Sequence, residues 1–144
     1  GSGCCGVISA RDQLGLKTRV VAVVSENANC YKLSVEAGRA IETNSASTFA
    51  DGMAVRVPHP DALEIISKGV DEIVEVSDDQ VADAIRLYYR ATHNVAEGAG
   101  AAPLAGLMSQ RDTMAGKRVG VILCGGNIDT SKMATVLDGR TPAP

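Results

Sequence analysis

The chain has 144 residues, 45% of them hydrophobic and 22% charged, which is typical of one globular domain, or part of one, with a hydrophobic core. Its net charge is −3 and no cluster of Lys and Arg occurs, which argues against nucleic acid or an anionic membrane surface as a partner. No apolar run approaches the roughly 20 residues of a membrane span, and nothing resembles a signal peptide. A cytoplasmic protein that binds a small ligand is therefore expected.

The cysteine and histidine positions argue against a metal site and against a disulfide framework. The four cysteines are Cys4, Cys5, Cys30 and Cys124. They form no Cys-x-x-Cys pair, and His59 and His93 are isolated in the sequence, so no His and Cys cluster for a metal is expected. Free thiols in a reducing compartment fit this pattern best.

The first part of the chain predicts a loop, a helix, a strand and a second helix. The Gly-rich stretch 1–6 reads as a loop, and Val7 to Leu14 reads as a short helix. Thr18 to Val24 is a β-branched run, typical of a strand covered on both faces. Ala28 to Ala37 predicts a helix stopped by Gly38, because a residue without a Cβ adopts the left-handed capping conformation at no steric cost.

The middle of the chain repeats this alternation. Pro60 to Lys68 predicts a helix that begins at a proline, and Val70 to Val76 predicts a strand. Ser77 followed three residues later by Gln80 is a capping-box signature, and an amphipathic helical pattern follows it.

The last part predicts two more helices around a third strand. Gly98 to Met108 is an Ala-rich helix in which Pro103 must lie in the first turn or bend the helix. Arg118 to Leu123 reads as a buried strand, the turn Cys124 to Asn127 follows, and Thr130 to Leu137 reads as a final helix. Strands that alternate with helices predict an α/β fold, a parallel sheet flanked by helices.

Four short motifs occur in a set order along the chain. They are Gly3-Cys4-Cys5-Gly6-Val7, Thr48-Phe49-Ala50-Asp51-Gly52, Glu97-Gly98-Ala99-Gly100-Ala101 and Cys124-Gly125-Gly126-Asn127. Taken alone, each has an ordinary explanation. A Gly-rich loop is weak evidence for phosphate binding, Ala-Asp-Gly is a common turn, a glutamate at a helix start stabilises the helix dipole, and a small cysteine often ends a buried strand.

Together the motifs resemble the serine/threonine dehydratase branch of the fold-type II pyridoxal-phosphate (PLP) enzymes. That branch carries a Gly-rich phosphate loop, Thr-x-Ala-Asp-Gly, Glu-x-Ala-Gly-Ala and Ser/Cys-Gly-Gly-Asn in the same order. The resemblance implies the tryptophan synthase β-like fold. Residues 1–140 would form the C-terminal part of its PLP-binding large domain, and residues 141–144 would form a loose tail.

The resemblance also implies which residues lie at the cofactor. The implied cofactor-binding residues are Gly3, Cys4, Cys5, Gly6, Val7, Asp51, Gly52, Glu97, Cys124, Gly125 and Asn127. Those of the first motif would supply the phosphate-facing backbone, although Cys4 and Cys5 replace family glycines. Glu97 would lie beside the cofactor ring, and Cys124 would face its pyridine nitrogen as a neutral partner.

The region where some relatives place a divalent cation departs from the family pattern. Ser25 falls at the strand end, where those relatives have glutamate, and Asn29 lies near their aspartate. Only Glu26 keeps a carboxylate nearby, so no metal site is predicted.

The family's Schiff-base lysine has no counterpart in this chain. The lysines are Lys17, Lys32, Lys68, Lys117 and Lys132, and none lies in the Ser-x-Lys context of the family. The chain is therefore expected to be the C-terminal half of an enzyme, without a catalytic residue of its own, without the small domain and inactive alone.

Three functional hypotheses remain open at this point. The first is part of a serine/threonine dehydratase-like ammonia-lyase, which eliminates water from a hydroxy amino acid to give a 2-oxo acid and ammonia; a racemase of the same family is its sibling. The second is a non-catalytic α/β module that binds a phosphorylated ligand, and the third is a structural or partner-binding α/β domain that binds no PLP. The expected partners are a small amino-acid substrate, the N-terminal half of the same enzyme on the same or a separate chain, and a second copy in a homodimer. The sequence does not identify the substrate.

Overall fold

A computed structural model describes residues 1–144 as an α/β fold with seven α-helices and a two-stranded sheet. The helices are α1 (Ser2–Gln13), α2 (Cys30–Ala37), α3 (Pro60–Gly69), α4 (Asp78–Thr92), α5 (Gly98–Ser109), α6 (Arg111–Met114) and α7 (Thr130–Leu137). The strands are β1 (Val21–Ser25) and β2 (Glu72–Val76), and a 3-10 turn, η1, covers Asp51–Met53.

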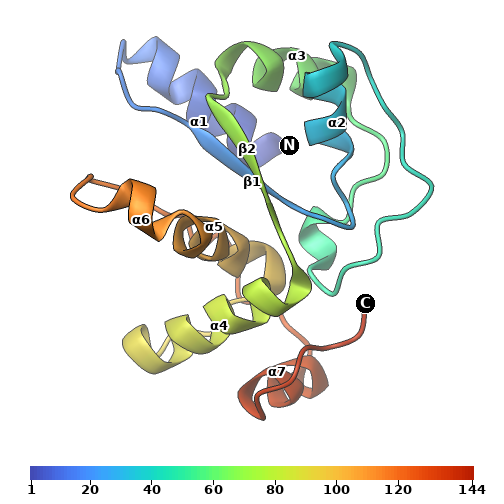
Figure 1. Ribbon diagram of the computed structural model, residues 1–144, viewed down its shortest axis with the longest axis vertical. Coiled ribbons are helices and arrows are strands. Elements are labelled where there is room, and N and C mark those ends of the chain that lie inside the picture. The colour runs from blue at the N-terminus through green and yellow to red at the C-terminus, as the bar shows by residue number, and fades with distance from the viewer.

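The two strands are parallel and pair from Val21 with Glu72 to Ser25 with Val76. In Figure 1 they run between α1, α2 and α3 above and α4, α5 and α6 below. The predicted α/β class with a parallel sheet flanked by helices is therefore confirmed. With only two strands in the sheet, however, most strand residues are half-buried, and only Ser25 and Val76 at the carboxyl ends are fully buried.

Local signals in the sequence placed the caps correctly. Gly38 ends α2 in the left-handed conformation with a φ of 64°. At the start of α4, the Ser77 side chain accepts a hydrogen bond from the Gln80 N–H, and the Gln80 side chain accepts one from the Ser77 N–H. A few neighbouring residues are enough to specify the end of α2 and the start of α4.

Helix α5 packs closely against the sheet because its sequence is rich in Gly and Ala. A Cβ atom added to Gly106 would lie 2.6 Å from Cγ2 of Val23, so β1 and the helix approach at a distance that only glycine allows. Pro103 lies inside the helix, beyond its first turn. The larger of two hydrophobic clusters contains α4 and α5 residues together with Phe49, Val76 and Val136.

The predicted opening loop is wrong, because residues 2–6 form the first turns of α1. The backbone ladder of this helix begins with the Cys5 N–H, which donates to the Gly1 carbonyl at 3.0 Å. The Cys5 thiol donates to the Ala62 carbonyl of α3 at 3.7 Å, so packing holds the segment in place. No glycine of this segment uses a positive φ, and so nothing in its backbone requires a loop.

The predicted strand at Arg118 to Leu123 is also wrong. These residues form neither helix nor strand, and no backbone N–H or carbonyl of residues 118–124 makes a hydrogen bond within the chain. Val119 and Ile122 are 44% and 57% exposed. The physical reason is that no other strand lies beside this segment to complete a ladder.

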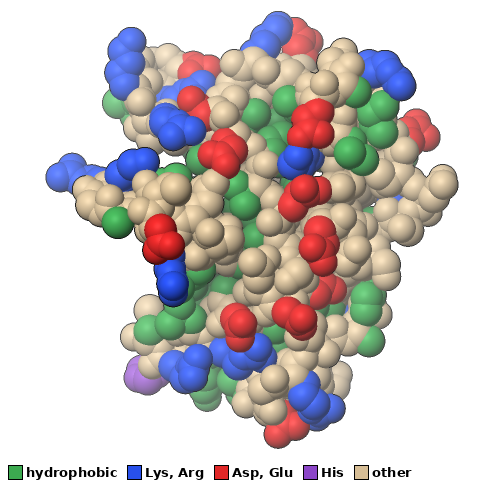
Figure 2. Space-filling model, in the orientation of Figure 1, with side chains coloured by type: hydrophobic (Ala, Val, Ile, Leu, Met, Phe, Trp, Pro, Cys, Tyr) green, Lys and Arg blue, Asp and Glu red, His purple; other side chains and the backbone are tan.

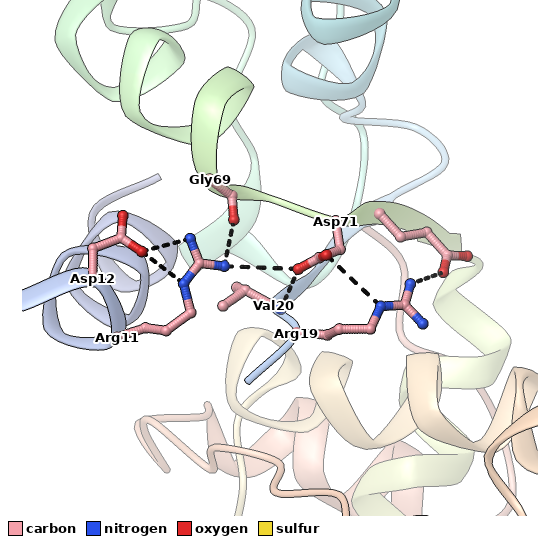
Figure 3. Close-up of polar contacts among 7 residues, drawn as sticks. Arg11, Asp12, Arg19, Val20, Gly69 and Asp71 are labelled. Carbon is pink, nitrogen blue, oxygen red and sulfur yellow. Dashed lines mark hydrogen bonds and ion pairs between the residues drawn. The ribbon is translucent and has the colours of Figure 1, made fainter. Parts of the chain in front are cut away.

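A network of polar side chains fixes the amino ends of both strands (Figure 3). Asp71, just before β2, accepts a hydrogen bond from the Val20 N–H at 2.8 Å and lies 3.7 Å from the Arg11 guanidinium. Arg11 also donates to the Gly69 carbonyl at 2.9 Å, and Arg19 lies 3.8 Å from Asp71. The network connects α1 and the end of α3 with the amino ends of both strands, at the end of the sheet opposite to the strands' carboxyl ends.

The C-terminal residues contact the rest of the molecule at two points. The Thr141 hydroxyl donates to the Asp79 carboxylate, and Pro142 is buried.

On the face drawn in Figure 2, Lys and Arg side chains are scattered and mixed with acidic ones. No helix is both long and apolar enough to cross a membrane.

Candidate active site

The segment Thr48 to Ala50 is held at the carboxyl end of β2 by the first residue of α4. The Thr48 hydroxyl donates to one carboxylate oxygen of Asp78 at 2.5 Å, and the Phe49 N–H donates to the other at 3.1 Å. The Ala50 N–H donates to the Thr48 hydroxyl oxygen at 3.1 Å. The turn η1, which contains Asp51 and Gly52, follows directly, and the Asp51 carboxylate accepts from the Gly52 N–H at 2.9 Å.

The start of α5 lies between this turn and the C-terminal Gly-Gly turn. A Cβ atom added to Gly98 would lie 2.7 Å from the Cα of Ala50, which places these two backbones in direct contact. On the other side, the Glu97 N–H donates to the Gly125 carbonyl at 3.1 Å. The structure therefore brings together three of the four motifs identified in the sequence.

Glu97 lies at the centre of this arrangement. A Cβ added to Gly125 would collide with its carboxylate, and a Cβ added to Gly52 would lie 3.9 Å from its Oε1 atom. Glu97 is half-buried, and its carboxylate makes no hydrogen bond or ion pair. It is a free hydrogen-bond acceptor located where the glycines of two turns approach it.

The C-terminal turn presents two polar side chains to the surface. Cys124 is a free and exposed thiol, and Asn127 is exposed with no side-chain hydrogen bond. The turn between them is compact, since the Ile128 N–H donates to the Gly126 carbonyl at 3.0 Å. Cys124 does not end a paired strand, because the strand predicted before it does not form.

The first motif lies in α1, apart from the other three. Gly3 and Gly6 have open space where a side chain would be, and no hydrogen bond joins this helix to the other motifs. The N–H groups of Ser2, Gly3 and Cys4 have no acceptor, as expected for a helix start without a side-chain cap. Burial, followed by the neighbouring Cys5 thiol, raises the pKa of Cys4, so this cysteine is a weak nucleophile.

In the region where some relatives place a cation, the side chains of Ser25 and Asn29 both make hydrogen bonds within the chain. The buried Ser25 hydroxyl accepts from the Asn27 N–H at 3.2 Å, and the Asn29 side chain donates to Glu75 at 2.7 Å. No group of three or more His, Cys, Asp or Glu side chains is arranged to hold a metal ion.

Sequence reasoning missed Asp78. The available signal was an acidic residue in the first turn of a helix that directly follows a strand, which places a carboxylate at the carboxyl end of the sheet.

Two surface hollows lie elsewhere, one of about 380 Å³ between α2 and α3 and one of about 220 Å³ between α4 and α5. Neither is lined by a residue of the four motifs.

The chain is similar in sequence and in structure to known proteins. The chain is 35% identical over 133 residues to the L-threonine ammonia-lyase of Thermotoga maritima, covering 92% of this chain and 33% of that protein. It is 37% identical over 133 residues to the beta-hydroxyaspartate dehydratase of Paracoccus denitrificans, covering 92% of this chain and 41% of that protein. The crystal structure of the T.th. threonine deaminase superposes with a TM-score of 0.81 at 31% identity, over 88% of this chain and 41% of that one.

The chain therefore spans between 33% and 41% of the length of these proteins. The family model described as pyridoxal-phosphate dependent enzyme matches residues 1–125, which include all or part of each of the four motifs. The chain belongs to the pyridoxal-phosphate-dependent enzyme family.

Proposed function

We propose that this chain is the cofactor-contacting part of a PLP-dependent ammonia-lyase of the threonine/serine dehydratase type. The observation that carries the proposal is the convergence of the Thr48–Gly52, Glu97–Ala101 and Cys124–Asn127 motifs around one free carboxylate. The similar proteins reported above are ammonia-lyases, dehydratases or deaminases by name, which favours elimination over racemisation.

The polar groups present fit PLP at both of its ends. A phosphate binds well to free N–H groups at a helix N-terminus, and α1 offers those of Ser2, Gly3 and Cys4 with no acidic side chain in its first turn. A pyridine nitrogen needs a neutral hydrogen-bonding partner, and the exposed Cys124 thiol can supply one. Of the predicted phosphate-facing residues Gly3 to Val7, only Gly3 and Cys4 keep a free backbone N–H, because the ladder of α1 begins with the Cys5 N–H. We therefore assign phosphate contact to these two N–H groups and that of Ser2, and contact with the remainder of the cofactor to the other predicted site residues.

When bound, PLP would withdraw electrons from the substrate's Cα and so make loss of a proton and of a β-hydroxyl group feasible. The residues of this chain would bind and orient rather than transfer protons. A thiol opposite the ring nitrogen leaves that nitrogen without a full positive charge, which suits elimination. Ala50 packs closely against Gly98, and Gly125 against Gly100, which leaves little room for water between these segments.

The lysine that anchors the cofactor would come from the remainder of the enzyme. In this chain, Lys32 pairs with Glu36 and Glu75, Lys68 pairs with Glu64, and no lysine makes a hydrogen bond or ion pair with the three converging motifs. The unpaired run 118–123 and the two-stranded parallel sheet both offer edges for additional strands. We therefore propose that an N-terminal half, on the same or a separate chain, completes this sheet, and that the complete enzyme acts on a small hydroxy amino acid as a homodimer.

The direct test is to measure PLP binding to the 144-residue chain by equilibrium dialysis, then reduce with borohydride and record the intact mass. Weak, non-covalent binding and an unmodified mass of 14.9 kDa are the expected result. Cys124→Ala should weaken binding by about ten-fold, as expected for loss of one hydrogen bond and its packing. Cys30→Ala is the matched control, because that thiol is buried away from the site.

A covalent pyridoxyl adduct on a lysine of this chain would contradict the assignment of the anchoring lysine to the missing half. Binding of inorganic phosphate that equals that of PLP and is unaffected by Cys124→Ala would instead favour a module for phosphorylated ligands. No binding of either would show that the isolated chain lacks a competent site.

A further inference from the structure

Asp78 is a side chain outside the four motifs that directly holds one of them. Both of its carboxylate oxygens accept hydrogen bonds from residues 48 and 49, at 2.5 Å and 3.1 Å. The segment that it holds is buried, with Thr48 5% exposed and Ala50 fully buried. Hydrogen bonds to a charged acceptor are stronger than neutral ones, so this contact is a firm anchor.

The anchor is connected to the site through two further contacts. The Thr48 hydroxyl that donates to Asp78 also accepts from the Ala50 N–H at 3.1 Å. Ala50 in turn lies against Gly98, the residue after Glu97. A continuous series of contacts therefore connects the first turn of α4 with the start of α5.

The hydrogen bonds of the turn between them are all local. In the backbone of η1, the Met53 N–H donates to Ala50, the Ala54 N–H to Asp51, and the Val55 N–H to Met53. The Asp51 side chain bonds only to its neighbour Gly52. Packing also contributes, since a Cβ on Gly52 would lie 2.9 Å from the Cβ of Ala99 and Met53 packs against the larger hydrophobic cluster. The only hydrogen bonds that tie this part of the chain to another element are those of the buried segment immediately before the turn.

We infer that Asp78 is a positioning residue of the candidate site, which holds the Asp51–Gly52 turn against Glu97 through Thr48 and Ala50. Its importance for the cofactor rests on the proposed function, whereas the anchoring of the turn does not. Asp78 would touch neither cofactor nor substrate.

The test is residue-resolved amide exchange by NMR on the full 144-residue chain, comparing Asp78→Ala with Asp79→Ala. Asp79 is the matched control because it occupies the next position of the same helical turn, while its carboxylate accepts from Thr141 and not from the site. Asp78→Ala should speed exchange at Ala50 and Met53 by about ten-fold or more, since two charge-assisted bonds are lost. Exchange in β1 should change no more than in the control.

Two further variants separate positioning from simple loss of stability. Thr48→Val keeps the carboxylate at the helix start but removes the hydroxyl, and should reproduce the faster exchange at Met53. Ala50 is not diagnostic in this variant, because its N–H loses its own acceptor. Asp78→Asn keeps one acceptor oxygen for the Phe49 N–H, and should restore part of the protection. If Asp78→Ala fails to fold, the exchange rate of Met53 in Thr48→Val decides the question.

The inference is overturned if Asp78→Ala and Thr48→Val leave exchange at Met53 unchanged. It is equally overturned if these two variants accelerate exchange throughout the chain, and no more at Met53 than Asp79→Ala does. PLP dialysis provides the separate readout. If the wild-type chain binds no PLP, the proposal that the isolated chain binds PLP is wrong, but the conclusion from amide exchange about Asp78 still stands. Where the wild-type chain binds PLP, unchanged affinity in Asp78→Ala overturns the role of the anchor at the site.

Discussion

The run Val21–Ser25 and the run 118–123 have similar sequences but different structures. Both are short and rich in Val, and both precede a polar turn. The first pairs along its length with β2, whereas the second makes no backbone hydrogen bond and exposes Val119 and Ile122. Composition therefore gives a segment the tendency to form a strand, but a strand forms only where a neighbouring strand pairs with its N–H and carbonyl groups.

The largest expected effect comes from Gly100 in α5, which packs against the turn that follows the unpaired run, compared with Gly120 inside the run. A Cβ at Gly100 would collide with the backbone carbonyl of Gly125, while Gly120, inside the unpaired run, has nothing within 4 Å. Gly100→Ala should lower the free energy of unfolding by about 3 kcal/mol, because backbone atoms cannot give way easily. Gly120→Ala should change it by less than about 0.5 kcal/mol. Urea denaturation measures both, and equal effects would mean that the run is packed in solution.

The same contrast can be measured with a matched pair of valines. Val76 on β2 is 1% exposed and Val119 on the run is 44% exposed. Val76→Ala should cost about 2 kcal/mol, since two buried methyl groups are lost and a cavity is left. Val119→Ala should cost less than about 0.5 kcal/mol by thermal or urea unfolding. A cost above about 1 kcal/mol at Val119 would contradict its exposed position.

The amino ends of the paired strands have a polar network that the run lacks. Asp71→Ala removes the acceptor for the Val20 N–H and the partner of Arg11, and should cost about 1–2 kcal/mol. Asp138→Ala, which removes an exposed pair with Arg140, is the control and should cost less than about 0.5 kcal/mol. If both variants unfold at the same urea concentration, the network adds nothing to strand pairing.

The smallest effect on stability, and the most local readout, concerns the thiols. Burial raises the pKa of Cys30 and, together with Cys5, that of Cys4, so both have little thiolate at neutral pH. Cys124 follows the unpaired run and is exposed, so iodoacetamide should alkylate it first at pH 7. Raising the pH should speed alkylation of Cys4 and Cys30, because their thiolate fraction grows as the pH approaches their raised pKa. Mass spectrometry of peptides checks the order, and faster alkylation of Cys30 would contradict its burial.

Elements specified by a few adjacent residues could be predicted from the sequence. The end of α2 at Gly38, the start of α3 at Pro60 and the capping box at Ser77 each depend on local chemistry, and each is confirmed. The two errors have another origin. The strand at Arg118 to Leu123 depends on a distant partner, and the opening segment is helical because α3 supports it.

The candidate site likewise has features that the sequence predicts and features that depend on distant contacts. The four motifs could be found in the sequence because each is a short continuous stretch, and their order carried the resemblance. The meeting of Glu97 with Gly125, and of Gly98 with Ala50, depends on how α5 packs, which no local pattern encodes. The contact of Asp78 with Thr48 connects residues 30 positions apart and was missed for that reason.

The wide sequence separation of the paired strands has a consequence for the order of folding. Val20 and Asp71, at the start of the pairing, are 51 positions apart, and α2 and α3 lie between them. Helices α4 and α5, by contrast, are neighbours in sequence and pack against each other. Closing the long loop costs more chain entropy than docking two adjacent helices. We therefore expect the α4–α5 hairpin to form in the earliest refolding phase and the strands to pair later. The residues around Glu97 would then acquire protection from exchange before those around Thr48.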